Sequence, residues 1–193
     1  MKLKKVLTIV FLIFSFHNIV KADDIKDFEI EGMSIGDSAL NYFSKKILIE
    51  NKKDWFKGGK YSISADLKPS LIKNYDSLQL VYLTNDKKFK LKGIEAIKFF
   101  QYDIDKCYSL FDEVSTQIQT LFSNITVSKK SNFKHSYDKS GKTTVTQQDL
   151  IFPNNDSVSI FCEDWSKETN FTDALRISIR TSSYKNFLLN VYN

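Results

Sequence analysis

Two cysteines, Cys107 and Cys162, are the only thiols in the chain. In an oxidising compartment, two isolated cysteines are first expected to form a disulfide. They lie too far apart in the sequence to supply the ligand cluster that a metal ion needs. We therefore predict a structural disulfide between them and no metal site, with two buried thiols as the alternative. The bridge would contribute roughly 4 kcal/mol of stability in the chain-entropy account.

His135 is the one histidine beyond residue 22, and Asp138 follows it closely. A Ser-His-Asp triad needs a histidine between a serine and a carboxylate. We identify no nucleophile elbow of the strand-turn-helix, Gly-x-Ser-x-Gly kind in the sequence, however. An exposed position at a strand end is the simpler interpretation of His135. A hydrolase that uses His135 and a nearby carboxylate such as Asp138 is therefore the alternative function.

Residues 140–143, Ser-Gly-Lys-Thr, match the end of a phosphate-binding loop. That loop needs a further glycine where this chain has Ser136, so that backbone N–H groups can surround the phosphates. It also needs the N-terminus of a helix to hold the anion, whereas predicted strands flank residues 140–143. We predict a hairpin turn here, with no nucleotide and no other cofactor.

Basic and aromatic residues are mixed between residues 45 and 60, a stretch with six lysines and two acids. Such a mixture can bind an anionic surface, because lysines attract the charge and aromatic rings pack against the surface. The candidate residues are Lys52, Lys53, Trp55, Lys57 and Lys60. The alternative is a solvated loop in which Trp55 packs on the core.

The first 22 residues predict a cleaved secretory leader. Three lysines within residues 2–5 precede an apolar run at 6–16, and Ala22 offers a small residue for cleavage before Asp23. The run is too short to span a bilayer, which takes about 20 apolar residues. We expect a periplasmic or secreted protein with no transmembrane segment after cleavage.

Removal of the leader changes the electrostatic argument. The full chain has 28 basic and 23 acidic residues, and the leader contains four of the lysines and no acid. The remaining 24 basic and 23 acidic residues nearly cancel. A near-neutral chain argues against nucleic acid as the partner.

Hydrophobic periodicity beyond the leader predicts an α+β fold. Residues 104–122 place apolar side chains on one stripe, and Asp103 can cap the helix that this pattern predicts. This long amphipathic helix needs a sheet to cover its stripe. Alternating apolar residues predict that sheet as an antiparallel meander over 61–99 and further hairpins over 133–181.

The remaining elements complete one domain with about three helices. A short strand is predicted at 27–31, then a helix that ends near Lys46, and a closing helix over 184–192. Residues 23–193 have an ordinary single-domain length. Two loosely similar halves, at about 23–101 and 102–193, share this plan.

Several short segments carry a resemblance when they are taken in order. They are Phe-Glu-Ile-Glu-Gly-Met-Ser-Ile-Gly-Asp-Ser at 28–38, Asp-Lys-Ser-Gly-Lys-Thr at 138–143, Cys-Glu-Asp-Trp at 162–165 and Leu-Arg-Ile-Ser-Ile at 175–179. Together they resemble an uncharacterised family of small secreted or periplasmic proteins from marine alphaproteobacteria with AT-rich genomes. The resemblance covers nearly the whole chain beyond the leader. It implies location and architecture and supplies no catalytic residue.

These patterns predict an exported, non-enzymatic domain that binds a protein or a ligand of the bacterial envelope. The near-neutral, aromatic-rich chain and the lack of a recognisable catalytic motif in the sequence favour binding over hydrolysis.

The leader gives the first testable prediction. Mass spectrometry of the exported protein should find an N-terminus near Asp23, because the cut follows the small residue Ala22. An intact Met1 in the exported fraction would contradict the predicted location.

Overall fold

The computed structural model describes residues 24–56, 59–67, 73–101 and 103–192, so the predicted leader and Lys57 lie outside the described residues. The described part has an α+β architecture, as predicted. Its strands are β1 (Lys52–Lys53), β2 (Tyr61–Leu67), β3 (Ser77–Leu83), β4 (Leu91–Phe100), β5 (Thr126–Val127), β6 (Ser131–Lys134), β7 (Thr144–Ile151), β8 (Ser157–Asp164) and β9 (Asp173–Arg180). Its helices are α1 (Lys45–Glu50), α2 (Ile104–Leu121) and α3 (Ser182–Tyr192), with single 3₁₀ turns at Ile25–Asp27 and Ala39–Asn41.

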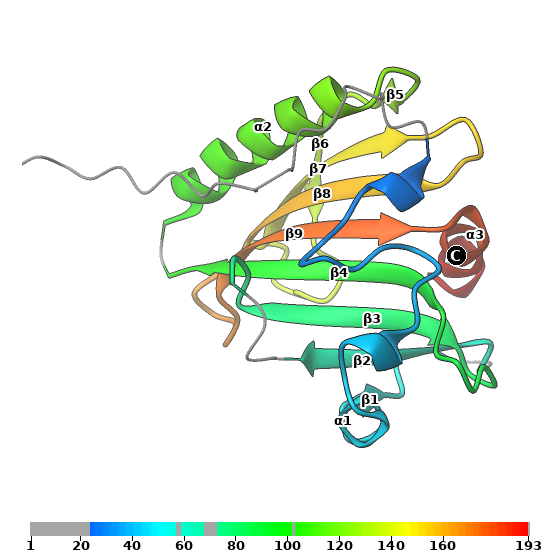
Figure 1. Cartoon of the computed structure of the whole chain (residues 1–193). Coiled ribbons are helices and arrows are strands. Elements are labelled where there is room, and N and C mark those ends of the chain that lie inside the picture. Colours follow the sequence, from blue (N-terminus) through cyan, green and yellow to red (C-terminus); the bar gives the residue numbers. More distant parts are fainter. Residues whose placement is uncertain (1–23, 57–58, 68–72, 102, 193) are drawn as a thin grey trace, which may run out of the picture.

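All nine strands belong to one antiparallel sheet (Figure 1). The strand order is β1-β2-β3-β4-β9-β8-β7-β5, and β6 pairs with β7 beside β5. The central pairing of β4 with β9 runs from Gly93 opposite Arg180 to Phe100 opposite Asp173. It joins the β2–β4 meander to the β7–β9 meander, so residues far apart in sequence share one continuous surface.

Helix α2 covers one face of this sheet, as its apolar stripe predicts. The Asp103 side chain caps it by accepting the Lys106 N–H, and its stripe packs chiefly on β8 and β9. Cys107 lies in the stripe and forms the predicted disulfide with Cys162 of β8, with the two Cα atoms 6.0 Å apart. The bridge fixes one end of α2 to the sheet. We call this side of the sheet the covered face.

The N-terminal segment differs from its prediction. The predicted strand at 27–31 is wrong, because a tight turn through Gly32 pairs Ile30 with Met33 instead. The predicted helix that ends near Lys46 is also wrong. The short 3₁₀ turn at Ala39–Asn41 and α1 replace it.

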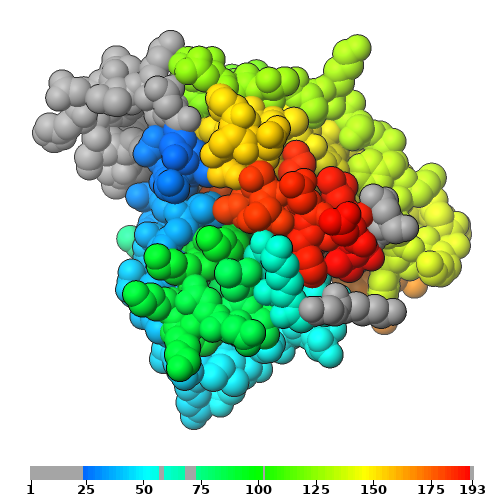
Figure 2. Space-filling model, turned by 90° about the vertical axis from the view of Figure 1, so that its right-hand side faces the viewer, coloured from blue at the N-terminus to red at the C-terminus, as the bar shows by residue number. Residues whose placement is uncertain are grey.

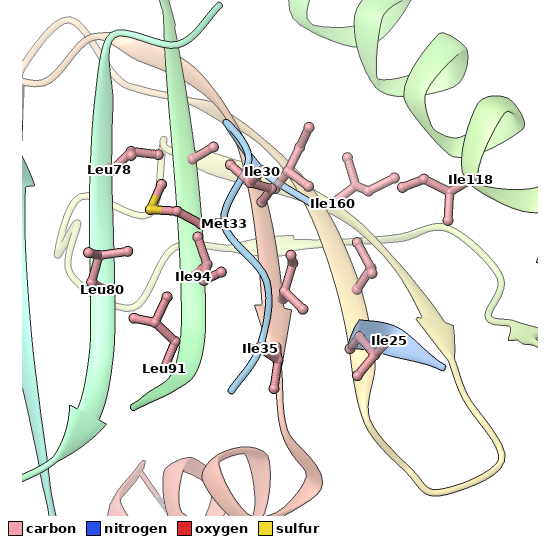
Figure 3. Packing of buried hydrophobic residues seen from close by; sticks show 14 of the residues in the cluster. Ile25, Ile30, Met33, Ile35, Leu78, Leu80, Leu91, Ile94, Ile118 and Ile160 are labelled. Atoms are coloured by element: carbon pink, nitrogen blue, oxygen red, sulfur yellow. The ribbon is translucent and has the colours of Figure 1, made fainter. Parts of the chain in front are cut away.

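Packing explains this outcome, since the segment crosses the covered face beside α2 and buries apolar residues along its length (Figure 3). Contacts with the sheet override the local periodicity there. The buried side chains of the segment include Ile25, Ile30, Met33 and Ile35.

The opposite face of the sheet has two parts. Helix α3 covers one part with a small aromatic core, in which Tyr184 packs against Tyr61 and Phe56. Gly93 permits this contact, because a Cβ added there would lie 3.0 Å from the Tyr184 ring. The other part carries polar and charged side chains, and we call it the polar face.

The disulfide gives a prediction for stability. Cys107→Ala and Cys162→Ala should each lower the free energy of unfolding by a similar amount, of order 2–4 kcal/mol, because either change removes the same bond. The double variant should be scarcely less stable than either single variant. Urea unfolding of the three variants and the wild type measures this. Additive losses would mean that the two thiols act independently.

Candidate functional site

The polar face is defined by strand register. Residues directly opposite each other in paired strands point to the same side of a sheet. One row across the face therefore contains Glu95, Ser178, Ser159 and Asp149. The next row contains Ile97, Arg176, Phe161 and Gln147. Cys162 and Glu163 are neighbours in β8, so the disulfide and Glu163 lie on opposite faces.

An ion-pair cluster occupies the centre of the polar face. The Arg176 guanidinium reaches Glu95 at 2.7 Å through Nη1 and Glu163 at 2.9 Å through Nε. Arg180 adds a longer contact of 3.8 Å to Glu95 and lies over the Phe161 ring. Two carboxylates thus face two guanidinium groups, and the cluster is neutral as a whole.

Arg176 holds this cluster together. Its side chain is only 25% exposed and Glu163 only 9%. Burial alone would lower the pKa of Arg176, but attraction to Glu95 and Glu163 outweighs burial and raises it above its ordinary value. Arg176 is therefore charged at every relevant pH, and the two carboxylates depend on it for compensation.

Four rings form an exposed aromatic cluster at one end of the polar face: His135, Tyr137, Trp165 and Phe171. Trp165 is central, with ring centroids 4.5 Å from both His135 and Phe171. Tyr137 completes the cluster at 5.4 Å from Phe171. Tyr137 is 65% exposed and Phe171 is 52% exposed. Figure 2 shows the hairpin that carries His135 and Tyr137, in yellow-green, projecting on the side away from the N-terminal segment.

Hydrogen bonds tie together the loops that carry these rings. The carboxylate of Asp138 accepts hydrogen bonds from the hydroxyl groups of Ser140 and Thr143. It also accepts from the backbone N–H groups of the same two residues. The buried Thr143 hydroxyl in turn accepts the Ser166 N–H from the β8–β9 loop. These bonds link the 138–143 turn, next to His135 and Tyr137, to the β8–β9 loop that carries Trp165 and Phe171.

The ion-pair cluster also contacts the aromatic cluster, through Glu163 and Trp165. The Trp165 indole N–H donates to Glu163 at 3.1 Å, and the Trp165 backbone N–H donates to Asp173 at 2.8 Å. Trp165 lies on the polar-face side with Glu163, whereas Cys162 points to the covered face.

His135 has a different carboxylate neighbour from the one the sequence suggests. Asp138 is committed to the turn, and Glu163 is the carboxylate that faces the ring, 3.9 Å from Nε2. The other ring nitrogen, Nδ1, accepts the Tyr137 N–H. In a triad that second nitrogen would accept the proton of the nucleophile. The arrangement therefore fits an anchoring role better than a catalytic one.

Sequence reasoning passed over one literal match to the nucleophile-elbow letters, Gly-x-Ser-x-Gly at 32–36. The structure places it in the N-terminal segment, outside any strand-turn-helix unit. Ser34 donates its backbone N–H to Asp37 on the covered-face side, away from His135. Residues 140–143 form the expected turn, in which Gly141 adopts a φ of +67° that favours glycine.

The predicted lysine-rich site is only partly a loop. Lys52 and Lys53 form the edge strand β1, and Lys53 pairs with Asp66 at 2.7 Å. Trp55 is 49% exposed, so the alternative in which it packs on the core is wrong; the neighbouring Phe56 is buried instead. Lys60 lies over the Tyr61 ring. The lysine-rich stretch is remote from the ion-pair cluster, at the β1 edge of the sheet (Figure 1).

No family model matches the chain, and neither a curated protein nor a solved structure matches it. Within the described residues, no helix is long and apolar enough to cross a membrane. In the same part of the chain, no group of three or more His, Cys, Asp or Glu side chains could hold a metal ion. Function is therefore inferred from the chemistry of the polar face.

The ion-pair cluster gives a prediction for stability. Arg176→Met should lower the free energy of unfolding by about 3 kcal/mol, because it leaves the poorly exposed Glu163 without a guanidinium and Glu95 with only the longer Arg180 contact. Adding Glu95→Gln and Glu163→Gln to that variant should recover most of the loss.

Arg180→Met is the matched control, since its contact with Glu95 is longer. Denaturant unfolding at neutral pH measures all these variants. Equal losses from Arg176→Met and Arg180→Met would show that the central guanidinium has no special role.

Asp138 gives a prediction for pH dependence. Hydrogen bonds from Thr143 and then from Ser140 hold the pKa of Asp138 well below its ordinary value. Its stabilising contribution is therefore present above the unfolded pKa of about 3.9 and is lost as pH falls through the lower folded pKa. Asp138→Asn should be less stable than wild type at neutral pH, and the difference should shrink below about pH 4. A difference that stays constant throughout acid titration would contradict this role.

Proposed function

We propose that this protein is an exported, non-enzymatic domain that binds another protein of the bacterial envelope through the aromatic cluster. The observation that carries the proposal is the four-ring cluster itself, exposed at Tyr137 and Phe171 and fixed at Trp165. Tyrosine, tryptophan and phenylalanine are enriched at protein interfaces, where they supply much of the binding energy.

Preorganisation supports the proposal. The Asp138–Thr143–Ser166 hydrogen bonds and the Trp165–Glu163 contact already fix the loops. A partner would not have to order these loops, so less binding energy is lost on association. Exposed aromatic rings that do not pack in the core would otherwise favour aggregation.

An exported location fits the covalent chemistry. The Cys107–Cys162 disulfide suits an oxidising compartment such as the periplasm or the exterior. The first 22 residues, which resemble a secretory leader, support the same location. The proposed origin, a family of secreted proteins from marine alphaproteobacteria, rests on the sequence resemblance alone.

The hydrolase alternative has one observation in its favour, namely the Glu163 carboxylate beside His135. It requires a nucleophile on the free side of the ring, where Nδ1 instead accepts a backbone N–H. We therefore favour binding. His135→Ala should leave any hydrolytic activity of the exported protein unchanged, whereas loss of an activity present in wild type would favour the alternative.

A photo-crosslinking experiment tests the proposed binding function. Benzoylphenylalanine at position 137, in the cell that exports the protein, should give a discrete crosslinked product with one envelope protein. Phe171→Ala in the same chain should weaken that product about tenfold, because it removes a ring from the binding surface at a cost of roughly 1–2 kcal/mol.

Position 189 is the matched control, since Leu189 is exposed on α3 at a distance from the cluster. The same product from position 189, or an unchanged product after Phe171→Ala, would contradict the proposed surface. Thermal unfolding followed by circular dichroism confirms that each variant is folded.

A further inference from the structure

A second surface lies at the β1 edge of the sheet, where α1 and β1 form a tip below β2 (Figure 1). It is separate from the aromatic cluster, which the β8–β9 loop and the hairpin between β6 and β7 carry. Four of the large apolar residues that are exposed in the described part of the chain fall between residues 40 and 55. Scattered exposed apolar residues need no explanation, but a group of them does.

Helix α1 exposes most of its apolar side chains. Only Leu48 is buried, whereas Ile47 is 42% exposed and Ile49 is 55% exposed. Trp55 lies two residues beyond the end of β1 and is 49% exposed. Ile47 and Ile49 are two positions apart and therefore lie on either side of α1. Together with Trp55 they give the tip exposed apolar side chains that the core does not use.

Lysines border this apolar surface. Lys45 and Lys46 begin α1, and Lys52 begins β1. In the described part of the chain, Lys46 has an ion-pair partner in Glu50 at 3.8 Å. No carboxylate there lies within ion-pair distance of Lys45 or Lys52. Asp54, which is exposed beside Trp55, also has no ion-pair partner in the described residues, so the unpaired groups of the tip are two lysines and one carboxylate.

The tip is anchored on both sides. On one side Leu48 is buried in the core and its carbonyl accepts the Ser64 hydroxyl at 2.7 Å. On the other side the Phe56 ring packs edge-on against Phe187 of α3 at 5.5 Å. The exposed side chains between Leu48 and Phe56 are therefore presented from a fixed base.

We propose that the α1–β1 tip docks on an anionic membrane surface. Isoleucine side chains and an indole ring suit the boundary between headgroups and acyl chains. Lysines at the border would meet the lipid phosphates and extend their stems along the apolar surface. Charge complementarity selects an anionic bilayer as the occupant, because lysines outnumber acids six to two between residues 45 and 60. The protein would bind the membrane peripherally and leave the aromatic cluster free for its partner.

Vesicle co-sedimentation tests this proposal. The chain that begins at Asp23 is used, so that the apolar run at 6–16 does not itself bind lipid. It should sediment with phosphatidylglycerol–phosphatidylcholine vesicles at low salt, far less at high salt, and little with pure phosphatidylcholine. Equal binding to both kinds of vesicle, or binding to neither, would overturn the proposal.

Variants locate the contact. Ile47→Ser with Ile49→Ser should reduce the partition coefficient about tenfold or more, the factor expected for losing about 1.4 kcal/mol of apolar contact. Phe99→Ser with Leu189→Ser makes a matched change at two equally exposed apolar positions elsewhere and should leave the coefficient unchanged. Equal reductions by the two variants would overturn the assignment to the tip.

Charge variants keep the test valid if the isoleucine variant fails to fold. Lys45→Gln with Lys52→Gln changes only exposed side chains and should weaken binding severalfold at low salt. Lys129→Gln with Lys134→Gln, beside β7 toward the opposite edge of the sheet, should not. In addition, brominated lipid should quench the tryptophan fluorescence of the wild type and quench Trp55→Phe much less. Identical quenching of the two proteins would place the contact elsewhere.

Discussion

Adjacent side chains in a β-strand must point to opposite faces of the sheet, and in β8 this rule separates two kinds of surface. Cys162 points to the covered face and holds α2 there through the disulfide. Glu163, the next residue, points to the polar face, forms an ion pair with Arg176 and accepts the Trp165 indole N–H. A shift of one residue in the register of β8 would bury the carboxylate under α2 and expose the thiol. The fold and the candidate site therefore depend on the same register.

The two faces also use different chemistry to reach a fixed arrangement. The covered face excludes water with apolar side chains from α2, the N-terminal segment and the sheet. The polar face cannot do this, because its central groups are charged. It compensates by pairing each carboxylate with a guanidinium and by fixing its loops with hydrogen bonds to Asp138 and Thr143. Such a face can stay exposed and ordered, as a binding surface requires.

Hydrophobic periodicity in the sequence predicted the fold well wherever that periodicity agrees with the packing. The stripe of α2 and the alternation of β2–β4 and β7–β9 fix both the elements and the parity that brings Cys107 to Cys162. The N-terminal segment was predicted wrongly, because its apolar residues serve an irregular chain that follows the surface of the sheet. Local periodicity carries no information about such a contact.

The candidate site was much harder to predict than the fold. Glu95, Glu163 and Arg176 are far apart in sequence and meet only because β4 pairs with β9 and β9 with β8. Glu163 in β8 and Trp165, the first residue after β8, share a parity that could have placed both on the face opposite Cys162. The contact between Trp165 and Phe171 depends on the conformation of a loop, which no short motif specifies.

Hydroxyl-radical footprinting in the native compartment tests the central claim, that the aromatic cluster is a binding surface, most directly. Side-chain oxidation is compared between the purified protein and the same protein in the intact envelope. Tyr137 and Phe171 should be oxidised rapidly when the protein is pure and become protected in the envelope. Phe111, which is buried on the covered face, should be protected in both. Equal oxidation of Tyr137 and Phe171 in the two settings would contradict the account.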